Sequence, residues 1–354
     1  MESYLWINAI IVFIIAFAVS SISVPLVIKL AIKKRLLGEY GEGRHIHKGY
    51  VPRLGGVAIY IGLFLSQIYF MISHYPSEHL SQPYFLLVFS SLLLFFLGTL
   101  DDLVDIKANL KFCIQLLVAL ILAWQADVRI VSFYGLFGVE TLPLWFSYLF
   151  SITVIAFFIN AYNLIDGIDS LSSSLGMYVL FCFGCVFIFN NAYADSLIVF
   201  SVFGALLGFW FYNKPPAKIF MGDSGTLSIG LIIAYFAIKT SNLPIDNQQT
   251  YSPVFIMIIW VYPVIDTLRV FTKRILSGVS PFTPDKNHIH HLLLNLGMSH
   301  GKATRVIILF SLILSGVAYL LRANPTTAFF VTVSLTVLIS FIPSFLLKRR
   351  ARQK

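Results

Sequence analysis

Long apolar runs separated by short polar stretches dominate the hydrophobic pattern of this chain. A helix needs about 20 mostly apolar residues to span the hydrocarbon core of a bilayer. Eleven segments come near this length, so the pattern predicts an all-α polytopic membrane protein with about eleven transmembrane helices. The fourth segment is short and the eighth contains a glycine, Gly230. The predicted spans cover residues 5–30, 54–73, 84–100, 110–124, 144–160, 172–189, 194–213, 225–240, 253–272, 304–321 and 326–347.

The Lys and Arg residues predict how these spans are oriented. Of the 25 basic residues, 22 fall in one alternate set of loops, which includes the stretches 29–53 and 269–305 and the C-terminal tail. The other set holds three, Arg129, Lys239 and Arg322. Because cytoplasmic loops carry the excess of Lys and Arg, we expect the N-terminus outside and the C-terminus in the cytoplasm.

Composition excludes several classes of protein. Hydrophobic residues make up 58% of the 354 and charged residues 12%, about half the usual share of a soluble domain. A soluble enzyme, a disordered chain and a nucleic-acid binder are therefore excluded, and the net charge of +9 reflects membrane orientation. We expect residues 1–354 to form a single integral membrane domain. Cys182 and Cys185 lie in an apolar run, which favours buried small hydrophobes over a redox pair.

Acidic residues gather at the predicted cytoplasmic ends of spans, although a carboxylate at mid-bilayer costs roughly 2.5–3.5 kcal/mol. Asp101, Asp102 and Asp105 follow the third span in LGTLDDLVDIK. If the helix continues, the three carboxylates lie within one turn and repel unless a cation sits among them. Mg²⁺ prefers such oxygen ligands. The alternative is an acidic cluster that the dipole of the fourth helix favours.

A second polar cluster, NAYNLIDGIDS, follows the fifth span. The spacing of Asn160, Asn163 and Asp166 predicts one broad helical face, and Gly167 then lets Asp169 point elsewhere. Neutral and charged oxygens side by side suit a cation or the polar edge of a nucleotide. A capping and turn cluster is the alternative.

The sequence FMGDSG precedes the eighth span, where Asp223 or Ser224 could cap the helix. Its glycines would let a ligand approach the backbone, and a helix N-terminus favours an anion. A simple cap and turn is the alternative. Asp266 lies in the ninth span with Arg269 three residues on, so an internal ion pair is as well supported as a functional role.

Two basic loops carry histidines. His288, His290 and His291 lie in DKNHIHH, with spacings that differ from structural zinc sites, so the side chains are better suited to bind phosphates. Lys48 and Arg53 lie in GRHIHKGYVPRLGG. Carboxylates, amides, histidines and basic residues on one membrane face indicate transfer of a phosphate-bearing group from a nucleotide to a lipid phosphate.

These motifs resemble, in order and over nearly the whole chain, those of the polyprenyl-phosphate N-acetylhexosamine-1-phosphate transferase family. The segments that carry the resemblance are HKGYVPRLGG, GTLDDLVDIK, NAYNLIDGIDSL, KIFMGDSGT and SPFTPDKNHIHH. The resemblance implies transfer of a sugar 1-phosphate from a UDP-sugar to undecaprenyl phosphate, with release of UMP. It also implies Mg²⁺ as cofactor, with Mn²⁺ as an alternative, and a bacterial cytoplasmic membrane with the active site facing the cytoplasm.

The resemblance also assigns roles to single residues. Asp101, Asp102 and Asp223 would be catalytic, and Asp223 and Asn163 would hold the metal. A phosphate monoester has its second pKa near 6, so Asp101 or Asp102 need accept only one remaining proton. A route through a phospho-aspartate stays open. The expected substrate-binding residues, with Asp169 near the uracil and Lys111 at the lipid phosphate, are Lys48, Arg53, Lys111, Asp166, Asp169, His288, His290 and His291.

One departure from the family's histidine motif narrows the choice of sugar substrate. Relatives that make the peptidoglycan precursor carry three consecutive histidines and then an acidic residue, whereas Ile289 and Leu292 stand here. This argues against a muramyl-pentapeptide substrate and favours UDP-N-acetylglucosamine, with 6-deoxy N-acetyl sugars as the alternative. The oligomeric state stays open, with a homodimer as one option.

Two other classes compete with this prediction. A membrane prenyltransferase also uses aspartate-rich motifs with magnesium, and residues 160–169 resemble a second such motif. A transporter should have its polar site near the bilayer midplane, whereas the polar residues here cluster at one end of the spans.

Overall fold

The fold of the protein was obtained as a computed structural model, which describes residues 2–34, 36, 51–74, 82–133, 135–243, 258–280, 285–322 and 324–353. These residues form helices without a β-strand; one isolated bridge joins Ser132 and Thr141. A short 3-10 helix, η1, covers Leu136–Gly138. The α-helices are α1 (Glu2–Lys34), α2 (Gly55–His74), α3 (Gln82–Val104), α4 (Ala108–Gln125), α5 (Leu144–Leu164), α6 (Leu171–Phe189), α7 (Tyr193–Asn213), α8 (Gly222–Ser241), α10 (Val261–Leu276), α11 (Ile289–Asn295), α12 (His300–Leu320) and α13 (Pro325–Arg352).

Ten of the helices in the described part of the chain are long and apolar enough to cross a membrane. They correspond to every predicted span except the ninth, so the protein is an all-α, multi-pass membrane protein. The weak fourth and eighth segments form continuous helices, α4 and α8. Gly230 lies inside α8, where an added Cβ would approach the Cα of Ile159 on α5 to 3.0 Å. The missing side chain therefore serves close helix packing.

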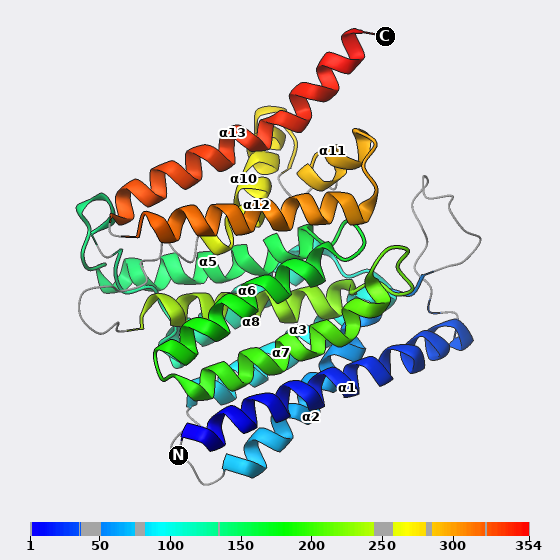
Figure 1. The fold of residues 1–354 in the computed structure, drawn as a ribbon, viewed down its shortest axis with the longest axis vertical. Coiled ribbons are helices and arrows are strands. Elements are labelled where there is room, and N and C mark those ends of the chain that lie inside the picture. Colours follow the sequence, from blue (N-terminus) through cyan, green and yellow to red (C-terminus); the bar gives the residue numbers. More distant parts are fainter. Residues whose placement is uncertain are drawn as a thin grey trace.

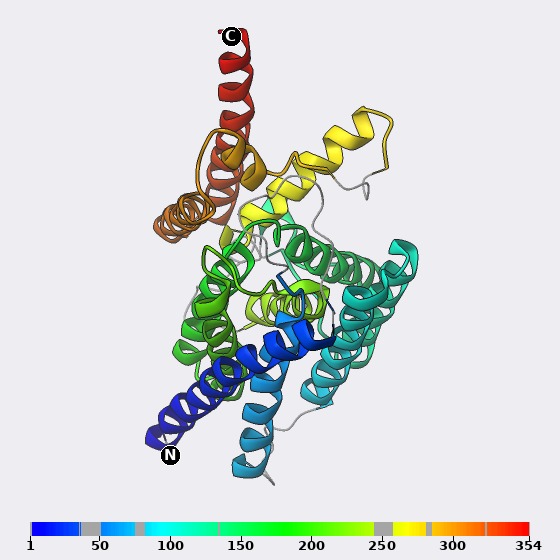
Figure 2. The same ribbon diagram turned by 90° about the vertical axis from the view of Figure 1, so that its right-hand side faces the viewer.

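The predicted span over 253–272 differs from the others. Its described part is interrupted at Trp260, and α10 begins at Val261 and has 16 residues. Both views show α10 running across the direction of the neighbouring helices (Figures 1 and 2). Asp266 and Arg274 of α10 are buried, and the predicted span is described only from residue 258 onward. Residues 253–257 lie outside the described part.

Helix α8 is the centre of the bundle. Nearly all of its side chains are buried, and α2, α3, α5 and α6 pack around it. Helices α1 and α7 pack together on one side, whereas α12 and α13 lie on the other side beside α10 and α11 (Figure 1). The exposed large apolar side chains on α1, α12 and α13 suit a helix surface in contact with lipid.

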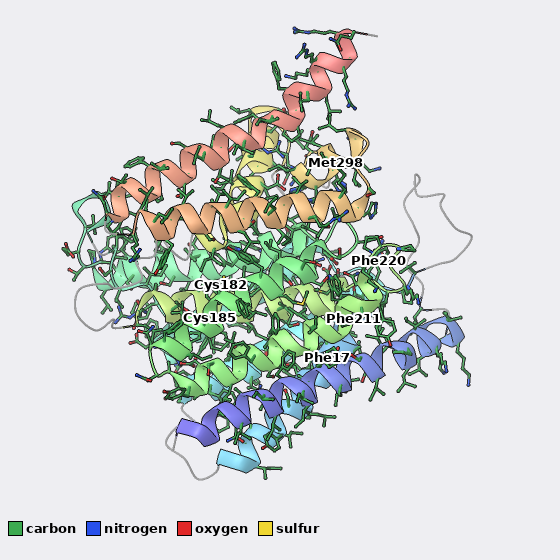
Figure 3. The ribbon with its side chains drawn as sticks, in the orientation of Figure 1. Phe17, Cys182, Cys185, Phe211, Phe220 and Met298 are labelled. Carbon is green, nitrogen blue, oxygen red and sulfur yellow. The ribbon has the colours of Figure 1, made fainter. Side chains whose placement is uncertain are left out.

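The two free thiols of α6, Cys182 and Cys185, lie within the bundle (Figure 3). The same view places Phe220 at the end of the bundle where α7 is followed by α8. Both cysteines lie inside the predicted helix and are half-buried.

The loops predicted to be cytoplasmic meet at one end of the bundle. Asp102, Lys111 and Asn163 all contact Asp223 or its backbone there. The opposite loops meet at the other end, where Asn242 donates to the carbonyl of Arg129 at 2.7 Å. The chain termini lie at opposite ends of the bundle (Figure 1). The structure thus supports the alternation of loops, and the charge bias predicts which end faces the cytoplasm.

Cysteine labelling tests this orientation. In a variant in which the native cysteines are replaced, Lys286→Cys and Asn191→Cys place single thiols at exposed positions of opposite ends. We expect a membrane-impermeant maleimide to label the cysteine at 191 in intact cells and the cysteine at 286 only after permeabilisation. Labelling of both in intact cells would contradict the orientation.

Candidate active site

The carboxylate of Asp223 is the centre of the polar cluster. It lies in the first turn of α8, and its Oδ1 accepts a hydrogen bond from Nδ2 of Asn163 at 3.0 Å. Its Oδ2 lies 3.1 Å from Nζ of Lys111, which also contacts Oδ2 of Asp101 at 2.8 Å. Helices α3, α4, α5 and α8 each contribute one of these four side chains. A single ammonium group therefore bridges two carboxylates from different helices.

The N-terminus of α8 is capped by another helix. No side chain of Asp223 or Ser224 caps α8, contrary to the sequence prediction. Instead Asp102 of α3 accepts the backbone N–H groups of Asp223 at 2.8 Å and Ser224 at 3.0 Å. These two donors are among the N–H groups that a helix leaves without a partner inside itself. The carboxylate of Asp102 thus fixes where α8 begins.

The third carboxylate of the DDLVD sequence points away from this cluster. Helix α3 ends at Val104, and Asp105 adopts a left-handed conformation (φ 49°) and is exposed. The helix does not continue through Asp105, which was the condition for placing Asp101, Asp102 and Asp105 around one cation. Asp101 faces Lys111 and also accepts the backbone N–H of Ile106 at 2.7 Å.

Glycines at the site make room for protein backbone, whereas the sequence predicted room for a ligand. Gly222 has a φ of +71°, and a Cβ there would meet the carbonyl oxygen of Arg53 and lie 2.6 Å from Oδ2 of Asp102. At Gly56 a Cβ would meet the backbone of Gly225. Backbone bonds from Phe220 to Pro52, Gly55 to Phe220 and Gly56 to Met221 join the two segments. A sequence motif alone carries no signal for this pairing.

The residues of NAYNLIDGIDS separate into different contacts. Asn160 donates to Ala156 O and to Gln115, so it joins α5 to α4. Asn163 donates to Asp223 and to Oγ1 of Thr226 at 2.7 Å. Because α5 ends at Leu164, the predicted common helical face stops short of the acidic residues.

Asp166 lies in the turn after α5 and accepts a hydrogen bond from Oγ of Ser172. Burial raises the pKa of Asp166 to about 7, and the negative charges of Asp223 and Asp169 act in the same direction, against the hydrogen bond from Ser172. A carboxyl group of this kind can change its protonation near neutral pH. Asp166 lies outside the spans, and the charge of Asp223 contributes to its raised pKa.

Asp169 contacts protein on both carboxylate oxygens. Oδ1 lies 3.1 Å from Nδ1 of His300, and Oδ2 accepts the backbone N–H of Ala217 at 3.3 Å. The prediction that Gly167 lets this side chain point elsewhere is confirmed. The side chain joins the turn after α5 to the start of α12 and to the loop before α8.

The histidine segment, residues 285–291, packs on the turn after α5 that carries Asp166. A Cβ at Gly167 would lie 3.2 Å from Nε2 of His291 and closer still to Nε2 of His290, so this glycine allows the imidazoles to approach. The rings of His288 and His290 are parallel, with centroids 5.5 Å apart. The structure therefore brings the histidines against the loop that carries Asp166.

Three other predictions concern residues outside this cluster. Arg53 is exposed on the segment that pairs with Phe220, and Lys48 lies outside the described residues. The predicted Asp266–Arg269 ion pair is present at 2.8 Å.

The donor set fits a magnesium ion. Asp101, Asp102, Asp166 and Asp223 bring four carboxylates to one region, with Lys111 between two of them. Among the described residues no three acidic, histidine or cysteine side chains are grouped as a complete metal site. Mg²⁺ commonly takes one or two carboxylates together with waters and substrate phosphates, so a sparse set suits it. Asn163 donates its amide N–H to Asp223 in this structure. Its side-chain amide would have to rotate for its oxygen to bind a metal ion.

The fold and this cluster define a class: a multi-pass membrane protein with an acidic, lysine-containing site at one end of its helices. Comparison with known proteins is consistent with this class. The model of glycosyl transferase family 4 matches residues 84–241.

Three curated relatives extend the match over most of the chain. The undecaprenyl-phosphate alpha-N-acetylglucosaminyl 1-phosphate transferase of Salmonella typhi is 28% identical, over 94% of this chain and 89% of that protein. A probable undecaprenyl-phosphate N-acetylglucosaminyl 1-phosphate transferase of Bacillus subtilis is 32% identical, over 93% and 88%. The decaprenyl-phosphate N-acetylglucosaminephosphotransferase of Mycolicibacterium smegmatis is 32% identical, over 85% and 79%. The chain belongs to glycosyl transferase family 4, the family of membrane-embedded sugar-phosphate transferases that its motifs resemble.

Proposed function

We propose that this protein transfers N-acetylglucosamine 1-phosphate from UDP-N-acetylglucosamine to undecaprenyl phosphate and releases UMP. The product would be the first lipid-linked intermediate of a cell-envelope polysaccharide. The observation that carries the proposal is the position of Lys111 between Asp101 and Asp223 at one end of the bundle. The names of the Salmonella, Bacillus and Mycolicibacterium relatives support the same reaction.

The proposed reaction is a phosphoryl transfer, in which positioning and charge neutralisation do most of the work. Lys111 would attract the lipid phosphate, and Arg53 and Lys48 would add positive charge nearby. Asp101 or Asp102 would accept the remaining proton of that phosphate; Asp101 contacts Lys111 directly, whereas Asp102 contacts the N-terminus of α8.

Asp223, with the amide oxygen of Asn163, would hold Mg²⁺ or alternatively Mn²⁺, and the ion would supply positive charge that stabilises the pyrophosphate and the departing UMP. Asp166 and Asp169 would contact the nucleoside, and the histidine segment would contact the sugar nucleotide. The charge bias of the loops supports a cytoplasmic location for this chemistry, and the bacterial relatives support a bacterial cytoplasmic membrane.

A direct assay tests the proposal. Purified protein in lipid vesicles is incubated with undecaprenyl phosphate, magnesium and UDP-N-acetylglucosamine that carries label in the sugar. We expect UMP and a labelled, charged glycolipid in equal amounts. Absence of label in the lipid, together with release of inorganic pyrophosphate in a parallel reaction supplied with a prenyl diphosphate, would instead indicate a membrane prenyltransferase.

The sugar is tested by competition. A site that hydrogen-bonds a substrate hydroxyl rejects the analogue that lacks it by about 10⁴-fold. We therefore expect UDP-N-acetylglucosamine to be used far better than UDP-N-acetylfucosamine, a 6-deoxy analogue, or UDP-glucose, which lacks the amide. A higher kcat/KM for the 6-deoxy sugar would change the sugar assignment and leave the reaction class intact.

A further inference from the structure

Helix α10 presents a polar stripe to the histidine segment. Tyr262, Asp266, Arg269 and Lys273 recur at the four- and three-residue spacing that places side chains on one face of a helix. Each of them contacts the segment 285–291. The contacts are Tyr262 Oη to His290 Nδ1 at 3.3 Å, Asp266 Oδ2 to His288 Nδ1 at 3.0 Å, Arg269 Nη2 to Asn287 O at 2.6 Å and Lys273 Nζ to Asn287 Oδ1 at 2.5 Å.

The first residue of the histidine segment, Asp285, is also bound to α10. Arg274 donates to Oδ2 of Asp285 at 3.0 Å, and Asn287 donates to Asp285 through its backbone and its side chain. Partial burial opposes ionisation of Asp285, but these hydrogen bonds and the charge of Arg274 hold its pKa below the usual range. The segment is therefore held to α10 at both ends, and its histidines have fixed positions.

Asp266 is the central residue of this contact. It is fully buried, and its Oδ1 accepts both the guanidinium of Arg269 at 2.8 Å and the backbone N–H of Ile289 at 2.9 Å. Its Oδ2 contacts Nδ1 of His288. A carboxylate paired with an arginine has no proton to donate, so the proton of the contact with His288 must lie on Nδ1.

Asp266 forms an ion pair with Arg269 as well as a contact with His288. Arg269 already balances the charge of Asp266, and the ring of His288 is 4% exposed. An imidazolium here would add a second buried positive charge beside Arg269, which is costly. With the proton on Nδ1, the other ring nitrogen, Nε2, keeps its lone pair and accepts hydrogen bonds.

We propose that Asp266 is a positioning residue that holds His288 as a neutral imidazole protonated on Nδ1, so that Nε2 accepts a hydrogen bond from the substrate. The donors that a UDP-N-acetyl sugar offers are its sugar and ribose hydroxyl groups, its amide N–H and the uracil N3–H. His288 would therefore accept from one of these donors, whereas the sequence motif suggested a group that binds phosphate. This assignment rests on the proposed function for the identity of the substrate and on the structure for the tautomer.

The tautomer is measured directly in the full-length protein. In bilayers that contain protein with ¹⁵N-labelled histidine, a His288→Gln difference spectrum assigns the nitrogens of His288. We expect Nδ1 with its proton and Nε2 without one. A protonated Nε2 in the unsubstituted protein, as the other tautomer or as the imidazolium, would overturn the proposal, and this outcome does not depend on any enzyme activity.

Asp266→Asn tests the coupling to activity. The amide can donate to Nδ1 and so favour the opposite tautomer; in serine proteases the corresponding change lowers kcat about 10⁴-fold. We expect a fall in kcat of at least about 10²-fold here. Asp195→Asn is the matched control, because it removes another buried carboxylate, paired with Lys239 at 2.6 Å at the opposite end of the bundle. This control should keep near-normal kcat.

The double variant separates positioning from a general structural effect. If Asp266 acts through His288, Asp266→Asn lowers kcat little further in a His288→Gln background. Losses that multiply would assign Asp266 a separate structural role and overturn the proposal. If the unsubstituted protein transfers no sugar phosphate, the proposed function fails, and the nitrogen spectrum still decides the tautomer.

Discussion

Asp223→Asn is expected to lower the rate of sugar-phosphate transfer by roughly 10³-fold while the protein still inserts and folds. The substitution keeps the size of the side chain and removes its negative charge. Lys111 then loses one of its two carboxylate partners, and the oxygen that would bind the metal becomes part of a neutral amide. The measurement is UMP release from vesicles at saturating and at limiting magnesium.

The matched control is again Asp195→Asn, which leaves the site untouched and should retain near-normal transfer. Thermal unfolding of both variants shows whether either loses its fold. Near-normal activity of the Asp223→Asn protein at limiting magnesium would reject Asp223 as the metal ligand.

Gly222→Ala is expected to have a comparable effect through the backbone. The residue has a φ of +71°, and an alanine Cβ would collide with the carbonyl oxygen of Arg53. The left-handed conformation alone costs alanine about 1–2 kcal/mol. The start of α8 must therefore move, and with it the two backbone N–H groups that Asp102 accepts. We expect transfer to fall by at least about 10²-fold, because Asp223 is the next residue.

Gly316→Ala on α12 is the control for this experiment. An added Cβ there meets nothing within 4 Å, so the substitution should leave transfer unchanged and raise helix stability by up to about 1 kcal/mol. Full activity and unchanged thermal stability of the Gly222→Ala protein would show that the start of α8 tolerates movement.

Helix positions could be predicted from the sequence because lipid imposes one constraint on every residue of a span. Ten spans and the grouping of their polar ends followed from apolar length and charge alone. Asp223, Asp101 and Lys111 also cluster as their motifs suggested. On α10, ion pairs within the protein compensate the charges of Asp266 and Arg274.

The contacts between distant segments could not be predicted in this way. Asp102 and the N-terminus of α8 are separated by about 120 positions in the chain, and periodicity describes only the face of a single helix. The same limit applies to the pairing of Gly56 with Met221 and to the contact of His288 with Asp266. Each depends on which helices become neighbours.

The enclosure of α8 also has a consequence for biogenesis. It is the least apolar of the ten membrane-length helices and the most completely covered by protein. In a lipid environment by itself, its Asp223 and Thr226 would lack the partners on other helices that the folded bundle supplies. The helices that pack most closely around it, α2, α3, α5 and α6, all precede it in the chain. During synthesis, the helices that surround α8 are therefore made before it, and α8 packs between them. The contact between Asp102 and the backbone of Asp223 can form only at that step.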